Sequence, residues 1–254
     1  LSENTIPRLY PMKGYLQATT SQLHEKDVKA AVDILLGGKE PVIIAGNGVH
    51  VSRAYDELKT LAELLAAPVA TSFLGKSAFP ENHPLALGVL GANGQKIAEK
   101  RVGQADVLLV VGTKLKPQDT IFEAPELIDP GRQKIVQIDV DPRNAGWTFP
   151  AEMGLIGDAK AILAQLGGEV ERRAPEAGAR SLGSVQKKLL EEKAAADYFE
   201  DDYTRAETDP ILAPRVLKVL REATEPSAIV TADAGNNRQW MLHYFQTREP
   251  RTFF

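Results

Sequence analysis

The sequence lacks cysteine altogether, and this absence excludes several kinds of chemistry. Its 254 residues hold no disulfide, no thiolate metal ligand and no thiol nucleophile. The four histidines have no metal-ligand spacing, and neither an H-E-x-x-H motif nor a G-x-S-x-G elbow occurs. We therefore expect no metal site and no catalytic residue in this chain, and the missing cysteines favour a reducing, cytoplasmic setting.

Long apolar runs and clustered positive charges are also missing. No apolar run approaches the roughly 20 residues that a membrane-crossing helix needs. The net charge of -4, with both signs interspersed, offers no basic surface for nucleic acid. Residues 1–16 contain no apolar segment preceded by basic residues, so no signal peptide is predicted. We expect a soluble protein that binds neither membrane nor nucleic acid, and the start at Leu1 suggests part of a longer polypeptide.

Apolar strands alternate with amphipathic helices through the first two thirds of the chain. This alternation predicts an α/β fold, a doubly wound parallel sheet with helices on both faces, which binds ligands beyond the carboxyl ends of its strands. The predicted strands are 42–45, 69–71, 107–111, 135–139 and 154–156, and the predicted helices are 25–36, 52–65, 95–101 and 159–166.

Composition divides the chain into four parts. Residues 1–24 are predicted to be an extended lead-in, 25–167 a central Rossmann-like nucleotide-binding domain, and 168–209 a polar linker with a charged helix. Residues 210–254 begin a further unit, with a helix at 212–221, a strand at 228–231, and then a loop and helix. This unit has too few strands to bury a core, so we expect it to pack against the central domain or to belong to a larger domain.

The glycine turn Gly46-Asn47-Gly48 lies between a strand and a helix. Exposed N–H groups and the helix dipole favour an anion at such a turn. The dinucleotide fingerprint is incomplete, because Val51 occupies its third glycine position and the second strand ends in Thr71-Ser72 without an acidic residue. An NAD-dependent dehydrogenase is therefore disfavoured. The alternative is that the glycines serve backbone geometry alone.

Three further loops should meet at the same sheet edge: 72–76, 91–94 and 112–114. They predict a glycine-lined crevice in which Lys76 and Lys114 neutralise phosphates. Asp139 could accept hydrogen bonds from ribose or ribitol hydroxyls, with helix capping as the alternative. Capping is favoured for Asp158, which precedes a helix.

The stretch TSFLGKSAFPENHPLALGVLG, residues 71–91, carries a family resemblance. With PVIIAGNGV before it and ADVLLVVGTKL, KIVQIDVDP and LIGDAKAIL after it, it resembles the central domain of thiamine-diphosphate-dependent enzymes of the acetolactate synthase family. The tail IVTADAGNNRQWMLHYFQTREPRTFF looks like the start of the family's C-terminal domain. The resemblance implies a homo-oligomeric, three-domain parent enzyme, a 2-oxo acid carboligase or decarboxylase that uses thiamine diphosphate and Mg²⁺.

The family's central domain holds FAD, holds ADP or is empty, and the resemblance assigns the contacts by position. The catalytic glutamate and the G-D-G motif are absent from this chain, so the chain alone is expected to be inactive. Thiamine diphosphate contacts would fall on Gly235, Asn236 and Asn237. FAD or ADP contacts would fall on Gly46, Asn47, Gly48, Ser72, Phe73, Leu74, Gly75, Gly91, Ala92, Asn93, Gly112, Thr113, Lys114, Asp139, Val140, Asp158 and Ala159.

One loop departs from the family pattern. Acetolactate synthases usually read G-A-R-F-D-D-R where this chain has residues 112–118, so Lys114 replaces an arginine, and Lys116 and Pro117 replace acidic residues. The more basic crevice suits a nucleotide phosphate and favours a divergent carboligase or decarboxylase. Two alternatives stay open: a stand-alone nucleotide-binding or assembly module, and a structural spacer with an empty crevice.

Overall fold

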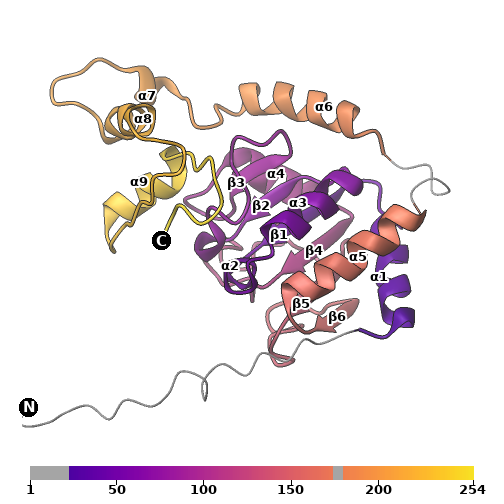
Figure 1. Cartoon of the computed structure of the whole chain (residues 1–254). Coiled ribbons are helices and arrows are strands. Elements are labelled where there is room, and N and C mark those ends of the chain that lie inside the picture. The colour runs from indigo at the N-terminus through magenta and orange to yellow at the C-terminus, as the bar shows by residue number, and fades with distance from the viewer. Residues whose placement is uncertain (1–22, 174–179) are drawn as a thin grey trace, which may run out of the picture.

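A computed structural model describes residues 23–173 and 180–254 and shows a central parallel sheet with helices around it (Figure 1). The six strands lie in the order β3-β2-β1-β4-β5-β6, and every neighbouring pair is parallel. This is the order of a doubly wound sheet, so the predicted fold class is confirmed. The strands are β1 (Pro41–Ala45), β2 (Val69–Thr71), β3 (Ala86–Val89), β4 (Val107–Val111), β5 (Lys134–Asp139) and β6 (Met153–Ile156).

Five helices belong to this central unit. Helix α3 packs against α5, and α5 packs against α1. In Figure 1 these three lie in front of the sheet and α4 lies behind it, as expected when right-handed crossovers run in opposite directions from β1. None of the described helices has the length and apolarity to cross a membrane. The five are α1 (Glu25–Gly37), α2 (Asn47–Ser52), α3 (Tyr55–Leu64), α4 (Lys96–Gln104) and α5 (Ala159–Arg173).

The two central strands are apolar throughout because both faces of the sheet are covered. All residues of β1 and β4 are buried. Ile44 of β1 lies between Ala70 of β2 and Val110 of β4. After β1, the chain adds β2 on one side of β1, and β4 later pairs with the other side of β1. The topological switch point therefore lies between β1 and β4. Ligands of doubly wound sheets bind beyond this point.

Two element predictions in this unit are wrong. The start expected for the helix at 52–65 is wrong: this helix is α3, which begins at Tyr55, and a separate helix, α2, precedes it and ends before Arg53, which has a left-handed φ of 54°. Strand β3 was not predicted at all. Its sequence ALGV is short and contains Gly88, which has a φ of 78° and coincides with an irregular register beside β2.

The region after the sheet differs from the expected linker. Residues 168–173 continue α5 as helix, so the linker prediction is wrong there, while 174–179, like the lead-in 1–22, lie outside the described residues. The charged helix is confirmed as α6 (Leu182–Ala195), which starts at an N-cap Ser181. It packs against the central unit through Glu192, which accepts from Arg101 Nε at 2.7 Å.

The C-terminal segment packs on the sheet through a small apolar cluster. Strand-edge residue Val89 lies in this cluster with residues of the segment, so packing against the central unit, one of the two expected alternatives, is confirmed. The strand expected at 228–231 is wrong: only an isolated parallel bridge joins Val230 and Phe253. The segment's helices are α7 (Asp202–Arg205), α8 (Ala213–Ala223) and α9 (Asn236–Tyr244), and its clustered residues are Met241, Leu242, Phe245 and Phe253.

Candidate functional site

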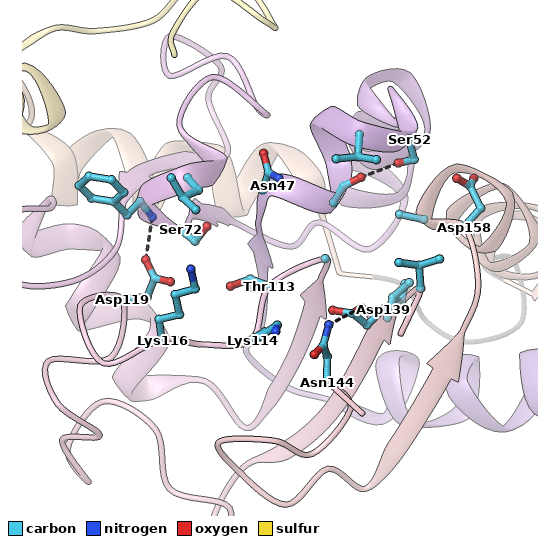
Figure 2. A pocket seen from close by; sticks show the side chains of 18 of the residues that line it. Asn47, Ser52, Ser72, Thr113, Lys114, Lys116, Asp119, Asp139, Asn144 and Asp158 are labelled. Carbon is cyan, nitrogen blue, oxygen red and sulfur yellow. Dashed lines mark hydrogen bonds between the residues drawn. The ribbon is translucent and has the colours of Figure 1, made fainter. Parts of the chain in front are cut away.

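A pocket of about 540 Å³ lies at the carboxyl ends of β1, β2, β4 and β5 (Figure 2). It spans the switch point, where the topology predicts a ligand. Figure 2 shows Asp119 and Lys116 at one end, Asp158 and Ser52 at the other, and Thr113 between them. The volume is in the usual range for small-molecule and cofactor sites.

The structure brings most of the predicted crevice residues to this pocket. Their role in binding a ligand stays a prediction. Those that line it are Asn47, Gly48, Ser72, Phe73, Leu74, Gly112, Thr113, Lys114, Asp139, Val140, Asp158 and Ala159. Those that do not are Gly46, Gly75, Gly91, Ala92 and Asn93.

The glycines let three strand-end loops approach closely. A Cβ on Gly112, whose φ is 61°, would lie 2.5 Å from the Cα of Gly48, and one on Gly75 would lie 2.3 Å from the carbonyl oxygen of Ala45. Gly48 N–H donates to the Gly112 carbonyl and Gly46 N–H to the Val111 carbonyl. These two N–H groups are therefore engaged in backbone packing. Anion binding at the turn stays a prediction, since Asn47 and Gly48 line the pocket.

The 91–94 loop packs against a segment that lines the pocket but does not line it itself. A Cβ on Gly91, with a φ of 103°, would lie 2.1 Å from the carbonyl oxygen of Gln118, which lines the pocket. Ala92 and Asn93 are exposed. This loop therefore shapes the site without facing it.

The carboxylates of the pocket already have partners on the chain. Asp158 caps α5 by accepting from Ala161 N–H at 3.0 Å, which confirms the capping alternative for this residue. Asp139 Oδ1 accepts from Asp141 N–H at 2.9 Å and Asn144 Nδ2 at 3.0 Å, and so it orders a turn instead of capping a helix. Asp119 Oδ1 accepts from Phe73 N–H at 2.7 Å, and burial raises the pKa of this carboxyl.

The placement of Lys76 in the crevice is wrong. Its side chain is 1% exposed, and Nζ lies 2.7 Å from Glu81 Oε1. Burial lowers the pKa of Lys76, while the charge of Glu81 opposes that shift. Lys114 does line the pocket, from an exposed position with Nζ 6.0 Å from the centre of the Trp147 ring, and Lys116 lines it as well.

Sequence reasoning did not assign several lining residues to the crevice. Val51, which is 75% exposed, was not assigned; together with the assigned Leu74, which is 53% exposed, it gives the pocket an apolar rim. The position of Val51 one turn after Asn47 could have indicated its direction. Arg238 had no such signal, because it lies far along the chain. The others are Ser52, Gln118, Asp119, Ile138, Asn144 and Gly157.

The predicted thiamine diphosphate residues lie outside this pocket. Gly235, with a φ of 129°, precedes α9, and Asn236 and Asn237 form its first turn. All three are exposed. The next residue, Arg238, lines the pocket, so the two predicted sites adjoin along α9.

Comparison with known proteins shows the family of this chain. Residues 28–166 match the family described as thiamine pyrophosphate enzyme, central domain. The chain is 34% identical to a probable acetolactate synthase large subunit of Methanocaldococcus jannaschii, over 98% of this chain and 41% of the relative. It is 36% identical to a sulfoacetaldehyde acetyltransferase of Alcaligenes xylosoxydans xylosoxydans, over 91% of this chain and 41% of the relative.

A third relative has the same extent of overlap. The acetolactate synthase isozyme 3 large subunit of Escherichia coli (strain K12) is 28% identical over 98% of this chain and 42% of its own length. The chain thus spans about two fifths of the length of the curated relatives it matches. The predicted resemblance is confirmed: the chain belongs to the thiamine pyrophosphate enzymes, with residues 28–166 forming their central domain.

Proposed function

We propose that this chain is the central part of a thiamine-diphosphate-dependent 2-oxo acid carboligase or decarboxylase, and that its pocket binds an adenine nucleotide, as FAD or ADP. The observation that carries the nucleotide proposal is the pocket at the switch point, with an apolar rim, hydroxyl groups and cations. A flat ring can pack on Val51 and Leu74, while Lys114 and Lys116 favour phosphates. The relatives named as acetolactate synthases and sulfoacetaldehyde acetyltransferases support the enzyme class.

The residues of this chain have binding and positioning roles in that enzyme. Gly235, Asn236 and Asn237, exposed at the start of α9, would approach the thiamine diphosphate. When bound, that cofactor supplies the carbon nucleophile for cleavage beside the carbonyl of a 2-oxo acid. The chain has no G-D-G sequence, so Mg²⁺ and the diphosphate would be held by further parts of the enzyme. We also propose that the enzyme is a homo-oligomer and that this chain alone is inactive.

Calorimetric titration of the purified chain with FAD, and separately with ADP, tests the nucleotide proposal. Saturable FAD binding that weakens in Lys114→Glu supports a flavin-containing enzyme, because the substitution reverses a charge in the pocket. Binding of ADP without FAD supports an ADP-binding relative. Lys96→Glu is a matched control, since Lys96 is exposed on α4 and does not line the pocket.

Absence of binding by either nucleotide would overturn the nucleotide proposal and favour the spacer alternative. The stand-alone module has a different test, which is the gene. A reading frame that ends near Phe254 supports a stand-alone module, whereas one that continues into a G-D-G motif supports the enzyme.

A further inference from the structure

Arg238 reaches the pocket from a distant part of the chain. Among the lining residues that the structure describes, it alone lies beyond α5. Its guanidinium carbon lies 4.7 Å from the centre of the Phe73 ring, and Phe73 is also a lining residue. The pocket is therefore built by the central unit and by α9 together.

The guanidinium of Arg238 has unused hydrogen-bonding capacity. Its Nε is shielded from solvent and has no hydrogen-bond partner in the part of the chain that the structure describes. A guanidinium has five N–H donors in a planar fork and stays charged at any physiological pH. A shielded donor without an acceptor is costly, so this geometry favours a ligand that brings acceptor oxygens.

The same end of the pocket carries a second cation. Figure 2 shows Lys116 beside Asp119, at the end opposite Asp158. Asp119 already accepts from the Phe73 N–H at 2.7 Å. The charge of Lys116 acts on Asp119, where it opposes the burial that raises the pKa of that carboxyl. Arg238 over Phe73 and Lys116 beside Asp119 thus bring two cations to an end of the pocket that holds one buried carboxylate, and the local charge favours an anion.

We propose that Arg238 binds the phosphate groups of the nucleotide in this pocket, with Lys116 as the second cation. This inference rests on the proposed nucleotide site, and it assigns the diphosphate, which FAD and ADP share, to the Phe73 end. Planar guanidinium groups suit phosphate because two parallel N–H groups reach two oxygens.

In this proposal the nucleotide contacts two parts of the molecule, α9 and the central unit. Arg238 lies in the first turn of α9, directly after Asn236 and Asn237, while Phe73 and Lys116 belong to the central unit. A ligand held by both parts binds more weakly when α9 is undocked, so binding stabilises docking by linkage. Occupancy of the pocket therefore also orders the predicted thiamine diphosphate residues.

Titration of the full chain with ADP and with adenosine, which lacks phosphates, tests the role of Arg238. Arg238→Met keeps an aliphatic stem over Phe73 but removes the guanidinium. It should raise the dissociation constant for ADP about tenfold or more, the usual effect of losing a hydrogen bond to a charged group, and leave that for adenosine unchanged. Arg251→Met is the matched control, because Arg251 is exposed, lies in the same segment and does not line the pocket.

Hydrogen exchange gives a second readout. Saturating ADP should slow exchange of the amides of α9 in the wild type and in Arg251→Met, but not in Arg238→Met. If Arg238→Met unfolds, Arg238→Lys takes its place: it keeps stem and charge, and the lost fork should still weaken ADP and leave adenosine unchanged.

Three results would overturn the inference. Unchanged ADP affinity in Arg238→Met and Arg238→Lys would make Arg238 a packing residue only. Equal losses for ADP and adenosine would show that Arg238 maintains the shape of the pocket without binding phosphate. If the wild type binds neither ADP nor FAD, the proposed nucleotide site itself fails; in the first two results that site stands.

Discussion

The ammonium of Lys76 lies 2.7 Å and 2.9 Å from the two carboxylate oxygens of Glu81, and both side chains are 1% exposed. The pair also joins the central unit to the C-terminal segment. Glu81 Oε2 accepts from the N–H of Thr247 at 2.6 Å and from its hydroxyl at 2.9 Å, and Lys76 Nζ donates to the Leu242 carbonyl at 3.3 Å. The buried ion pair of the central unit and the hydrogen bonds that hold the C-terminal segment thus form one network.

Glu81→Gln should destabilise the protein by about 3 to 5 kcal/mol, because it leaves the buried Lys76 ammonium without its counter-charge. The double variant Lys76→Met/Glu81→Gln should lose less, since glutamine still offers Thr247 an acceptor oxygen and no charge is buried. Denaturant unfolding measures both, with Glu207→Gln, at an exposed position, as control. A double variant less stable than Glu81→Gln alone would contradict this account.

Gly112→Ala should cost about 2 to 4 kcal/mol, since alanine is strained at a φ of 61° and its Cβ would lie 2.5 Å from the Cα of Gly48. Gly168→Ala is the opposite case: Gly168 is exposed in α5, with no heavy atom within 4 Å of an added Cβ. It should stabilise by about 0.5 to 1 kcal/mol. Thermal unfolding of both variants compares them, and equal shifts in the same direction would refute the close-approach argument.

Loss of Glu192 should destabilise more than loss of Glu40, although both pair with the buried Arg101. The side chain of Glu192 is 16% exposed and that of Glu40 is 52% exposed, so solvent screens the Glu40 pair more. We expect about 2 kcal/mol for Glu192→Gln and less than about 1 kcal/mol for Glu40→Gln. Hydrogen exchange within α6 should increase more in Glu192→Gln than in Glu40→Gln, because Glu40 contacts α6 through the exposed Lys188. The reverse order of stabilities would rule out this assignment.

Lys193 should make stability depend on pH. Burial lowers its pKa to about 8, although Nζ donates to the carbonyls of His83 and Pro84. Above pH 8 the folded chain gives up this proton, while the unfolded chain keeps it up to its ordinary pKa near 10.5. The free energy of unfolding should therefore rise between pH 8 and about 10.5, relative to Lys193→Met. If the difference in free energy of unfolding between the wild type and Lys193→Met stays constant across this pH range, the prediction fails.

The parallel sheet was largely predictable because its strands are buried on both faces. Continuous apolar runs such as Val107–Val111 are typical of strands that a parallel sheet buries on both faces. Short elements were harder to predict. Strand β3 contains a glycine with positive φ, and the expected strand at 228–231 has a partner only in the bridge from Val230 to Phe253.

The pocket was predictable where the topology fixes it. Loops after β1, β2, β4 and β5 must meet at one edge, which is why most of the predicted crevice residues line the pocket. Side-chain direction could not be read in the same way. Lys76 follows a pocket loop but turns inward to Glu81, and Arg238 enters the site because of how the C-terminal segment packs. Both outcomes depend on contacts between residues more than 150 positions apart or on buried pairs, which local patterns do not encode.

The length of helix α6 determines the direction in which its contact residues point. With 14 residues at 1.5 Å each, it is about 21 Å long, and it leads from the end of the central unit to the C-terminal segment (Figure 1). Each added or removed residue within it would turn Glu192 and Lys193 by about 100° away from their partners. Natural variants of this chain should therefore keep the length of α6 constant, even where its exposed side chains differ.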